Sequence, residues 1–237
     1  MTREAFDQQI KDLLDDTLLL GSMVGEMIFE SVETLKNRDF LKARKIYKDD
    51  KKINRKRFEI EENTLITIAT QAPMARDLRI LASILDISKE LERMGDYAKG
   101  IALINVRMGE ESLLKPLIDI PEMARITVDM LQRALDAFLN SDAEAAAAIP
   151  VEDDKVDDLY NQVHEDLLGF MTSDQATIDR ATHLLWVAHN LERAADRVTN
   201  ICERIQFVIT GEMFEVKSSD DEMKKKNVKR LMNPGDN

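Results

Sequence analysis

Apolar residues recur at spacings of three and four along six stretches of the chain, which is the period of a helix that buries one face. These stretches are separated by short polar segments, and none of them alternates as a half-buried strand does. The pattern therefore predicts an all-α protein with six long helices. They cover about residues 3–36, 39–70, 75–108, 121–139, 141–172 and 174–211.

The segments between these stretches carry residues that start or stop helices. Asp39 is placed to cap the second helix, Pro73 breaks the chain before the third, and Gly109 follows the third as a C′ residue. Ser141 with Glu144 three residues later has the form of a capping box for the fifth helix. Further signals are Pro121 in a first helical turn, Pro150 at an expected kink, Ser173 and Asp174 at a cap, and Gly211 at the last helix end.

The second half of the chain repeats the first. Asn-Arg-Asp at 37–39 aligns with Asn-Ser-Asp at 140–142, 103 positions later, and Leu-Glu-Arg-Met-Gly-Asp at 91–96 aligns with Leu-Glu-Arg-Ala-Ala-Asp at 191–196, 100 positions later. The shortening by three falls where the second and third helices of each unit join, and helix–helix loops tolerate such changes. A period this long indicates a duplicated domain. The expected organisation is one three-helix bundle over 1–109, a second over 118–212 and a mobile tail over 213–237.

Charge and composition exclude several classes of protein. The chain has 45 acidic and 33 basic residues and a net charge of −12, which argues against a nucleic-acid partner. Its single cysteine, Cys202, lies in an apolar helical pattern and is expected in the core. The longest apolar-looking run, 18–29, contains Glu26 and is too short to span a bilayer. With a charged N-terminus that lacks a signal-peptide core, these features predict a cytoplasmic protein without membrane insertion.

Paired oxygen-bearing side chains are the main candidate for chemistry. Residues four apart share one face of a helix, so each pair directs its oxygens the same way. A single pair means little in a chain this acidic. However, if the helices are antiparallel neighbours, the two pairs of each unit reach the same height within about one helical turn. The pairs are Asp50 with Asn54, Glu92 with Asp96, Asp153 with Asp157, and Glu192 with Asp196.

A cluster of carboxylate and amide oxygens suits a hard cation such as Mg, Mn, Ca or iron better than a structural zinc site. We expect tighter binding in the second unit, because Asp157 supplies a charged oxygen where Asn54 supplies a neutral amide. His164 and His183 have no partner at ligand spacing, and His189 precedes Glu192 by three, the reverse of the Glu-x-x-His order of di-iron bundles.

Other signals of an enzyme are missing from the sequence. It contains no P-loop, GxSxG or GxGxxG motif. Trp186, on the apolar face of the sixth helix, is expected in the core. No catalytic residue is therefore predicted.

Several motifs in order make the chain resemble the PhoU family of phosphate-signalling regulators over about residues 1–214. They are Gln-Ala-Pro-Met-Ala-Arg-Asp-Leu-Arg at 71–79, Leu-Glu-Arg-Met-Gly-Asp-Tyr-Ala at 91–98, Leu-Glu-Arg-Ala-Ala-Asp-Arg at 191–197 and Thr-Asn-Ile-Cys-Glu at 199–203. The chain departs from the family pattern at Asn54, where an acid is expected, and at Ala195, where glycine is usual. Gly100 also differs from Asn200, its counterpart in the second copy.

The resemblance implies two three-helix bundles with metal clusters held by E(D)xxxD motifs. It leaves the metal open among iron, Mn, Mg and Zn. It also implies a cytoplasmic, non-catalytic homodimer that acts with the ATPase subunit of the Pst phosphate transporter and with the PhoR sensor histidine kinase. Such a regulator keeps phosphate-starvation genes off when phosphate is plentiful.

Two alternatives remain open from the residues. The first is a helical scaffold whose acidic pairs form only a solvated face, which metal analysis of the purified protein distinguishes. The second is a carboxylate-bridged metalloenzyme, disfavoured by the missing Glu-x-x-His motif.

Overall fold

The structure, a computed structural model, describes residues 3–213, and every regular element within them is helical. The predicted all-α class is confirmed. The elements are α1 (Arg3–Lys36), α2 (Phe40–Gln71), α3 (Ala75–Met108), α4 (Asp119–Asn140), α5 (Ala143–Ala148), the 3₁₀ turn η1 (Ile149–Glu152), α6 (Asp153–Ser173), the 3₁₀ turn η2 (Gln175–Thr177) and α7 (Ile178–Thr210).

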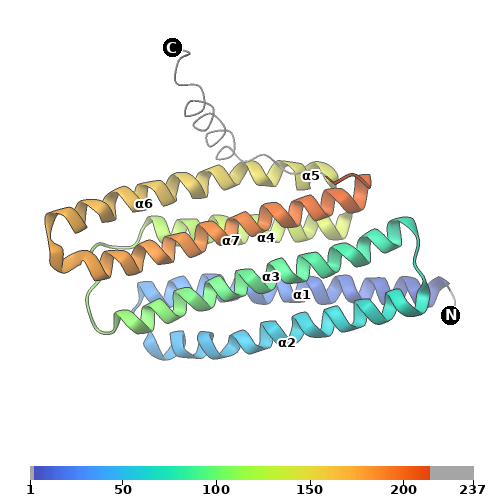
Figure 1. Cartoon of the computed structure of the whole chain (residues 1–237), viewed down its shortest axis with the longest axis horizontal. Coiled ribbons are helices and arrows are strands. Elements are labelled where there is room, and N and C mark those ends of the chain that lie inside the picture. The colour runs from blue at the N-terminus through green and yellow to red at the C-terminus, as the bar shows by residue number, and fades with distance from the viewer. Residues whose placement is uncertain (1–2, 214–237) are drawn as a thin grey trace, which may run out of the picture.

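The helices form two bundles that lie side by side (Figure 1). Helices α1, α2 and α3 make the first bundle, and α4, α6 and α7, with the short α5, make the second. Helix α3 packs against α7 and α1 packs against α4, so the junction joins equivalent helices of the two copies. The predicted pair of three-helix bundles related by duplication is confirmed.

Aspartates begin the helix after the first loop of each bundle. The Asp39 side chain accepts a hydrogen bond from the backbone N–H of Lys42 at 2.9 Å, which confirms the predicted cap. The predicted capping box at Ser141 is wrong. Ser141 has φ of 53° and ends α4, while Asp142 accepts from the N–H of Ala145 at 2.9 Å and starts α5. The internal repeat already pairs Asp142 with Asp39. Because Ser141 is the left-handed C-cap of α4, the N-cap of the next helix falls to Asp142.

The fifth apolar stretch is broken rather than only kinked. Pro150 has no N–H to donate, and the chain around it forms η1 between α5 and α6. Asp174, predicted to cap the sixth helix, accepts from the N–H of Ala176 and begins η2, so α7 starts only at Ile178. Gly211 ends α7 with φ of 80°.

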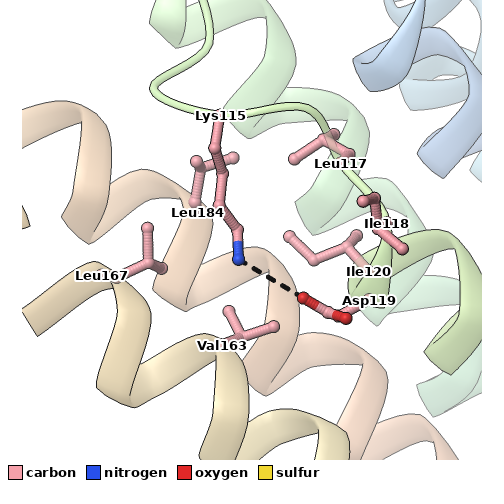
Figure 2. Close-up of a pocket in the computed structure, with 8 residues that line it drawn as sticks. All are labelled: Lys115, Leu117, Ile118, Asp119, Ile120, Val163, Leu167 and Leu184. Atoms are coloured by element: carbon pink, nitrogen blue, oxygen red, sulfur yellow. Dashed lines mark hydrogen bonds and ion pairs between the residues drawn. The ribbon is translucent and has the colours of Figure 1, made fainter.

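The linker between the bundles packs onto the end of the second bundle (Figure 2). Leu117 is buried against a small apolar pocket that α6 and α7 line with Val163, Leu167 and Leu184. Above it, the Lys115 Nζ atom lies 3.4 Å from Asp119 Oδ2 and also pairs with Asp166. The linker thus forms one wall of this pocket, which is small and offers little room to a ligand.

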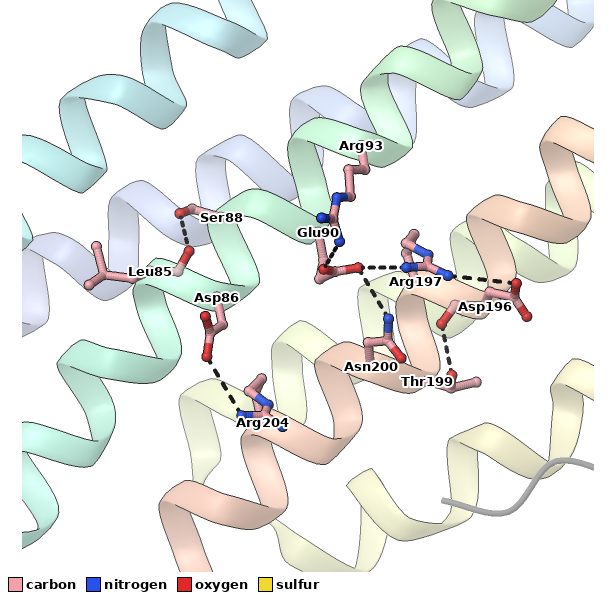
Figure 3. Close-up of polar contacts among 10 residues, drawn as sticks. All are labelled: Leu85, Asp86, Ser88, Glu90, Arg93, Asp196, Arg197, Thr199, Asn200 and Arg204. Atoms are coloured by element: carbon pink, nitrogen blue, oxygen red, sulfur yellow. Dashed lines mark hydrogen bonds and ion pairs between the residues drawn. The ribbon is translucent and has the colours of Figure 1, made fainter. Parts of the chain in front are cut away.

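Polar contacts connect α3 to α7 across the junction (Figure 3). The Glu90 Oε2 atom accepts from Asn200 Nδ2 at 3.2 Å and lies 3.3 Å from Arg197 Nη1. Asp86 and Arg204 pair at 3.6 Å further along the same helices. These contacts run antiparallel and hold the two copies in one register.

Several other expectations concern single features. Cys202 is buried as predicted, and burial raises the pKa of its thiol to about 12. No helix in the part of the chain that the structure describes is long and apolar enough to cross a membrane. The predicted mobile tail lies outside the described residues, apart from Met213.

Candidate metal centres

The structure brings the four predicted residues of the first unit together on neighbouring faces of α2 and α3. We call Asp50, Asn54, Glu92 and Asp96 the first cluster. Burial raises the pKa of Glu92, and the negative charges of Asp96 and Asp50 raise it further. The helices approach closely here because Gly95 leaves room for Ile53, which lies 3.2 Å from where a glycine Cβ would stand.

A lysine with no predicted role lies inside the first cluster. Lys99 Nζ donates to Asp50 Oδ2 at 2.8 Å and lies 3.4 Å from Asp96 Oδ1. Asn54 Nδ2 donates to the same Asp50 oxygen at 3.1 Å. Lys99 follows Asp96 by three residues, so its position on the same helix face was readable from spacing. The hydrogen bond to Asp50 raises the pKa of Lys99, which stabilises the ammonium form.

The second unit gathers carboxylates at the equivalent place. We call Asp153, Asp157, Glu192 and Asp196 the second cluster; the first two lie on α6 and the last two on α7. Asp153 is only 4% exposed, and its Oδ1 atom has no hydrogen-bond partner among the described residues. Burial raises the pKa of Asp153 to about 8, with further contributions from the charges of Asp157, Asp196 and Glu192.

Basic groups also border the second cluster, but those of the described residues pair with Asp196 or Glu192 and not with the buried Asp153. Asp196 Oδ2 lies 3.0 Å from Arg193 Nη1 and 3.7 Å from Arg197 Nη2. His189 Nδ1 lies 3.4 Å from Glu192 Oε2, so His189 adjoins the cluster although sequence spacing alone gave it no role.

The prediction that Trp186 belongs to the core is wrong, because 56% of its surface is exposed. Its ring meets His189 edge to face at a centroid distance of 5.7 Å, and Tyr160 lies 6.3 Å from the same histidine. The helical stripe of α7 instead buries the neighbouring Val187 and Ala188. Trp186 is apolar but lies one position before the buried stripe, so residue type alone does not reveal its exposure.

The residues of the second cluster fit a hard cation chemically. An unpaired, buried carboxylate oxygen surrounded by further carboxylates is costly without a positive charge, and oxygen donors are what Mg²⁺, Mn²⁺, Ca²⁺ and iron prefer. Between Arg3 and Met213, no three Asp, Glu, His or Cys side chains stand in a geometry ready to hold a metal ion. Binding at the second cluster therefore requires rotation of side chains such as Asp157, Glu192 and Asp196, which are partly buried.

The stability of the protein freed of metal by a chelator is expected to depend on pH through Asp153. Its folded pKa of about 8 exceeds the ordinary 3.8. The folded state therefore holds a proton that the unfolded state has lost, and the associated stability is full below pH 3.8 and disappears as pH rises to about 8. The loss is no more than about 1.4 kcal/mol per pH unit. Melting curves of wild type and Asp153→Asn in chelator, from pH 5 to 9, should diverge in favour of the variant and run parallel above pH 8. Parallel curves throughout would contradict the assignment.

The fold and the clusters define a class: a tandem three-helix-bundle protein with a cluster of oxygen-bearing side chains on each copy. The chain belongs to the PhoU domain family, whose domain matches residues 17–104 and 120–205.

Individual relatives match over most of their length. The chain is 33% identical over 217 residues to the phosphate-specific transport system accessory protein PhoU homolog of Clostridium acetobutylicum, covering 91% of this chain and 99% of that protein. It is 30% identical over 216 residues to the PhoU protein of Escherichia coli, covering 91% and 90%. The crystal structure of the phosphate transport system regulatory protein PhoU from Streptococcus pneumoniae superposes with a TM-score of 0.83 at 31% identity, covering 89% of this chain and all of that one.

Proposed function

We propose that this chain is a non-catalytic accessory protein of a phosphate-specific transport system that keeps phosphate-starvation genes off when phosphate is plentiful. The observation that carries the proposal is the presence of both PhoU domains, in order, in a chain that aligns with 99% of a relative named as such an accessory protein. Regulation in this proposal works by protein contact. The long exposed helix faces offer surface for it, and the sequence contains no catalytic motif.

The partners that follow from the family resemblance are the ATPase subunit of the Pst transporter and a PhoR-type sensor histidine kinase, with the chain acting as a cytoplasmic homodimer. The second cluster holds a metal ion in the active form of the protein. Asp153, Asp157, Glu192 and Asp196 are the residues that would hold it, and the ion would take the place of the proton that the buried Asp153 keeps in its absence.

A reporter of a phosphate-starvation promoter tests the proposal in cells. Deletion of the gene should switch the reporter on in phosphate-rich medium, and the wild-type gene on a plasmid should switch it off again. The purified chain should also retain the transporter ATPase subunit in a pull-down. An unchanged reporter after deletion would overturn the proposed function.

A further inference from the structure

We propose that Lys99 takes the place of a metal ion in the first cluster, so that this chain carries one metal site, on its second bundle, instead of two. The inference rests on the proposed metal site of the second cluster. It departs from what the family resemblance implies, namely a metal cluster on each bundle.

The Lys99 ammonium lies in a site built for a cation. It donates to the buried Asp50 at 2.8 Å, lies 3.4 Å from Asp96 and stands 5.7 Å from the centre of the Tyr47 ring, whose face attracts positive charge. Asp50 is 3% exposed, so water screens this pair little. Asn54 Nδ2 donates to the same Asp50 oxygen, so both polar neighbours of this oxygen are hydrogen-bond donors.

The internal repeat shows what changed between the two copies. Shifting Lys99 by the 100 positions that relate α3 to α7 gives Thr199, whose hydroxyl donates to the backbone oxygen of Asp196 at 2.7 Å (Figure 3). Shifting Tyr47 by the 103 positions that relate the earlier helices gives Pro150. The second copy therefore has neither an ammonium nor an aromatic ring at these two equivalent positions.

The acidic partner changes in the opposite direction. Asn54 becomes Asp157 in the second copy, so the cluster without the lysine has one more carboxylate. A Lys ammonium is a compact single charge with three donors, and it can satisfy two carboxylates but not four. Loss of one carboxylate and gain of one ammonium in the first cluster together lower the negative charge that a divalent ion would meet.

A metal ion that took Asp50 Oδ2 as a ligand would have to displace the Lys99 ammonium from it. That displacement would break a hydrogen bond between charged groups at a buried oxygen, which is costly. Asp50 Oδ1 and Asp153 Oδ1 are both buried without a hydrogen-bond partner among the described residues. The difference is that Lys99 pairs with the other oxygen of Asp50, whereas no lysine, arginine or histidine of the described residues forms an ion pair with Asp153. The Lys99 ammonium thus offsets the negative charge of the first cluster, and a bound metal ion offsets that of the second.

Substituting residues of the first cluster by their counterparts in the second tests the proposal. The full chain is stripped with chelator and titrated with Mn²⁺ alone, with bound Mn²⁺ counted by electron paramagnetic resonance. The variant Asn54→Asp with Lys99→Thr should gain a second class of bound Mn²⁺, at least about tenfold tighter than any residual binding there, since ligand charge sets affinity at oxygen sites. Adding Asp50→Asn should remove the gain. The control Lys89→Thr takes the same charge from an exposed position on α3 and should gain nothing.

The converse substitution places a lysine in the second cluster and removes no buried side chain. Thr199→Lys should cost the second cluster at least about tenfold in Mn²⁺ affinity and raise the melting temperature of the chelated protein. Thr199→Met, of similar length but without charge, should retain Mn²⁺ binding. This pair keeps the test valid if the Lys99 variant folds poorly.

Two results would overturn the proposal. One is a folded Asn54→Asp, Lys99→Thr variant that gains no Mn²⁺, and the other is a fall in wild-type Mn²⁺ stoichiometry on Asp50→Asn alone. Failure of the proposed second site looks different: wild type would bind no Mn²⁺, or Asp153→Asn would leave its binding unchanged. The gain or its absence at the rebuilt first cluster still decides the role of Lys99 in that case.

Discussion

Replacing Glu192 and Asp196 together with alanine is expected to abolish Mn²⁺ binding at the second cluster while the protein stays folded. The side chains of Glu192 and Asp196 are 23% and 31% exposed and flank a buried stripe that includes Leu191 and Ala195. Alanine favours helix at least as well as either acid, and the ion pairs that Asp196 makes with arginines are partly exposed and of small value. The change should therefore remove ligands without removing core.

The same variant is expected to lose repression of phosphate-starvation genes in phosphate-rich medium, if the loaded cluster belongs to the signalling surface. The measurements are Mn²⁺ counting, a melting curve and the promoter reporter. Glu92→Ala with Asp96→Ala is the matched control at the equivalent positions of the first copy, and it should leave Mn²⁺ stoichiometry unchanged. A folded, metal-free variant with full repression would show that the cluster is dispensable for signalling. An unfolded one would place the two acids in the core.

Leucine at Gly21 is expected to lower the melting temperature by about 2–12 °C, through about 1–3 kcal/mol of overpacking at the α1–α4 junction. A Cβ at Gly21 would stand 2.1 Å from Leu135 Cδ1, and Leu135 is itself buried. Leucine favours helix over glycine, so any loss must come from the contact between the bundles and not from the helix.

Gly169→Leu is the matched control for this substitution. Gly169 lies exposed within α6, and no described atom outside its own helix surroundings stands within 4 Å of where its Cβ would be. That change should raise the melting temperature by about 1–4 °C through helix propensity. Leu135→Ala should recover part of the loss in the Gly21 variant, because the two side chains compete for one space. Equal melting temperatures for the two leucine variants would contradict a tight junction.

Features encoded by short-range pattern were predictable from the sequence alone. The three-and-four spacing of apolar residues specified the long helices, because one face of each must be buried. The repeated motifs at 91–96 and 191–196 specified two copies of one unit, and the four-residue spacing of acids specified which side chains share a helix face. Antiparallel packing of neighbouring helices places Asp50 near Glu92 and Asp153 near Glu192, as the structure has them.

Only the tertiary structure decided which charges meet and which oxygens stay unpaired. Spacing could place Lys99 beside Asp96, but its bond to Asp50 depends on how closely α2 approaches α3 at Gly95. The exposure of Trp186 likewise depends on how α7 is rotated against its neighbours, since a shift of one residue turns a side chain by about 100° around a helix. Helix period is a property of the local chain, whereas burial and charge pairing at a given atom arise from the packing of distant segments. The sequence therefore determined the bundles and their acidic faces. Packing determined that Lys99 reaches the buried Asp50 of one face, whereas no cation of the described residues pairs with the buried Asp153 of the other.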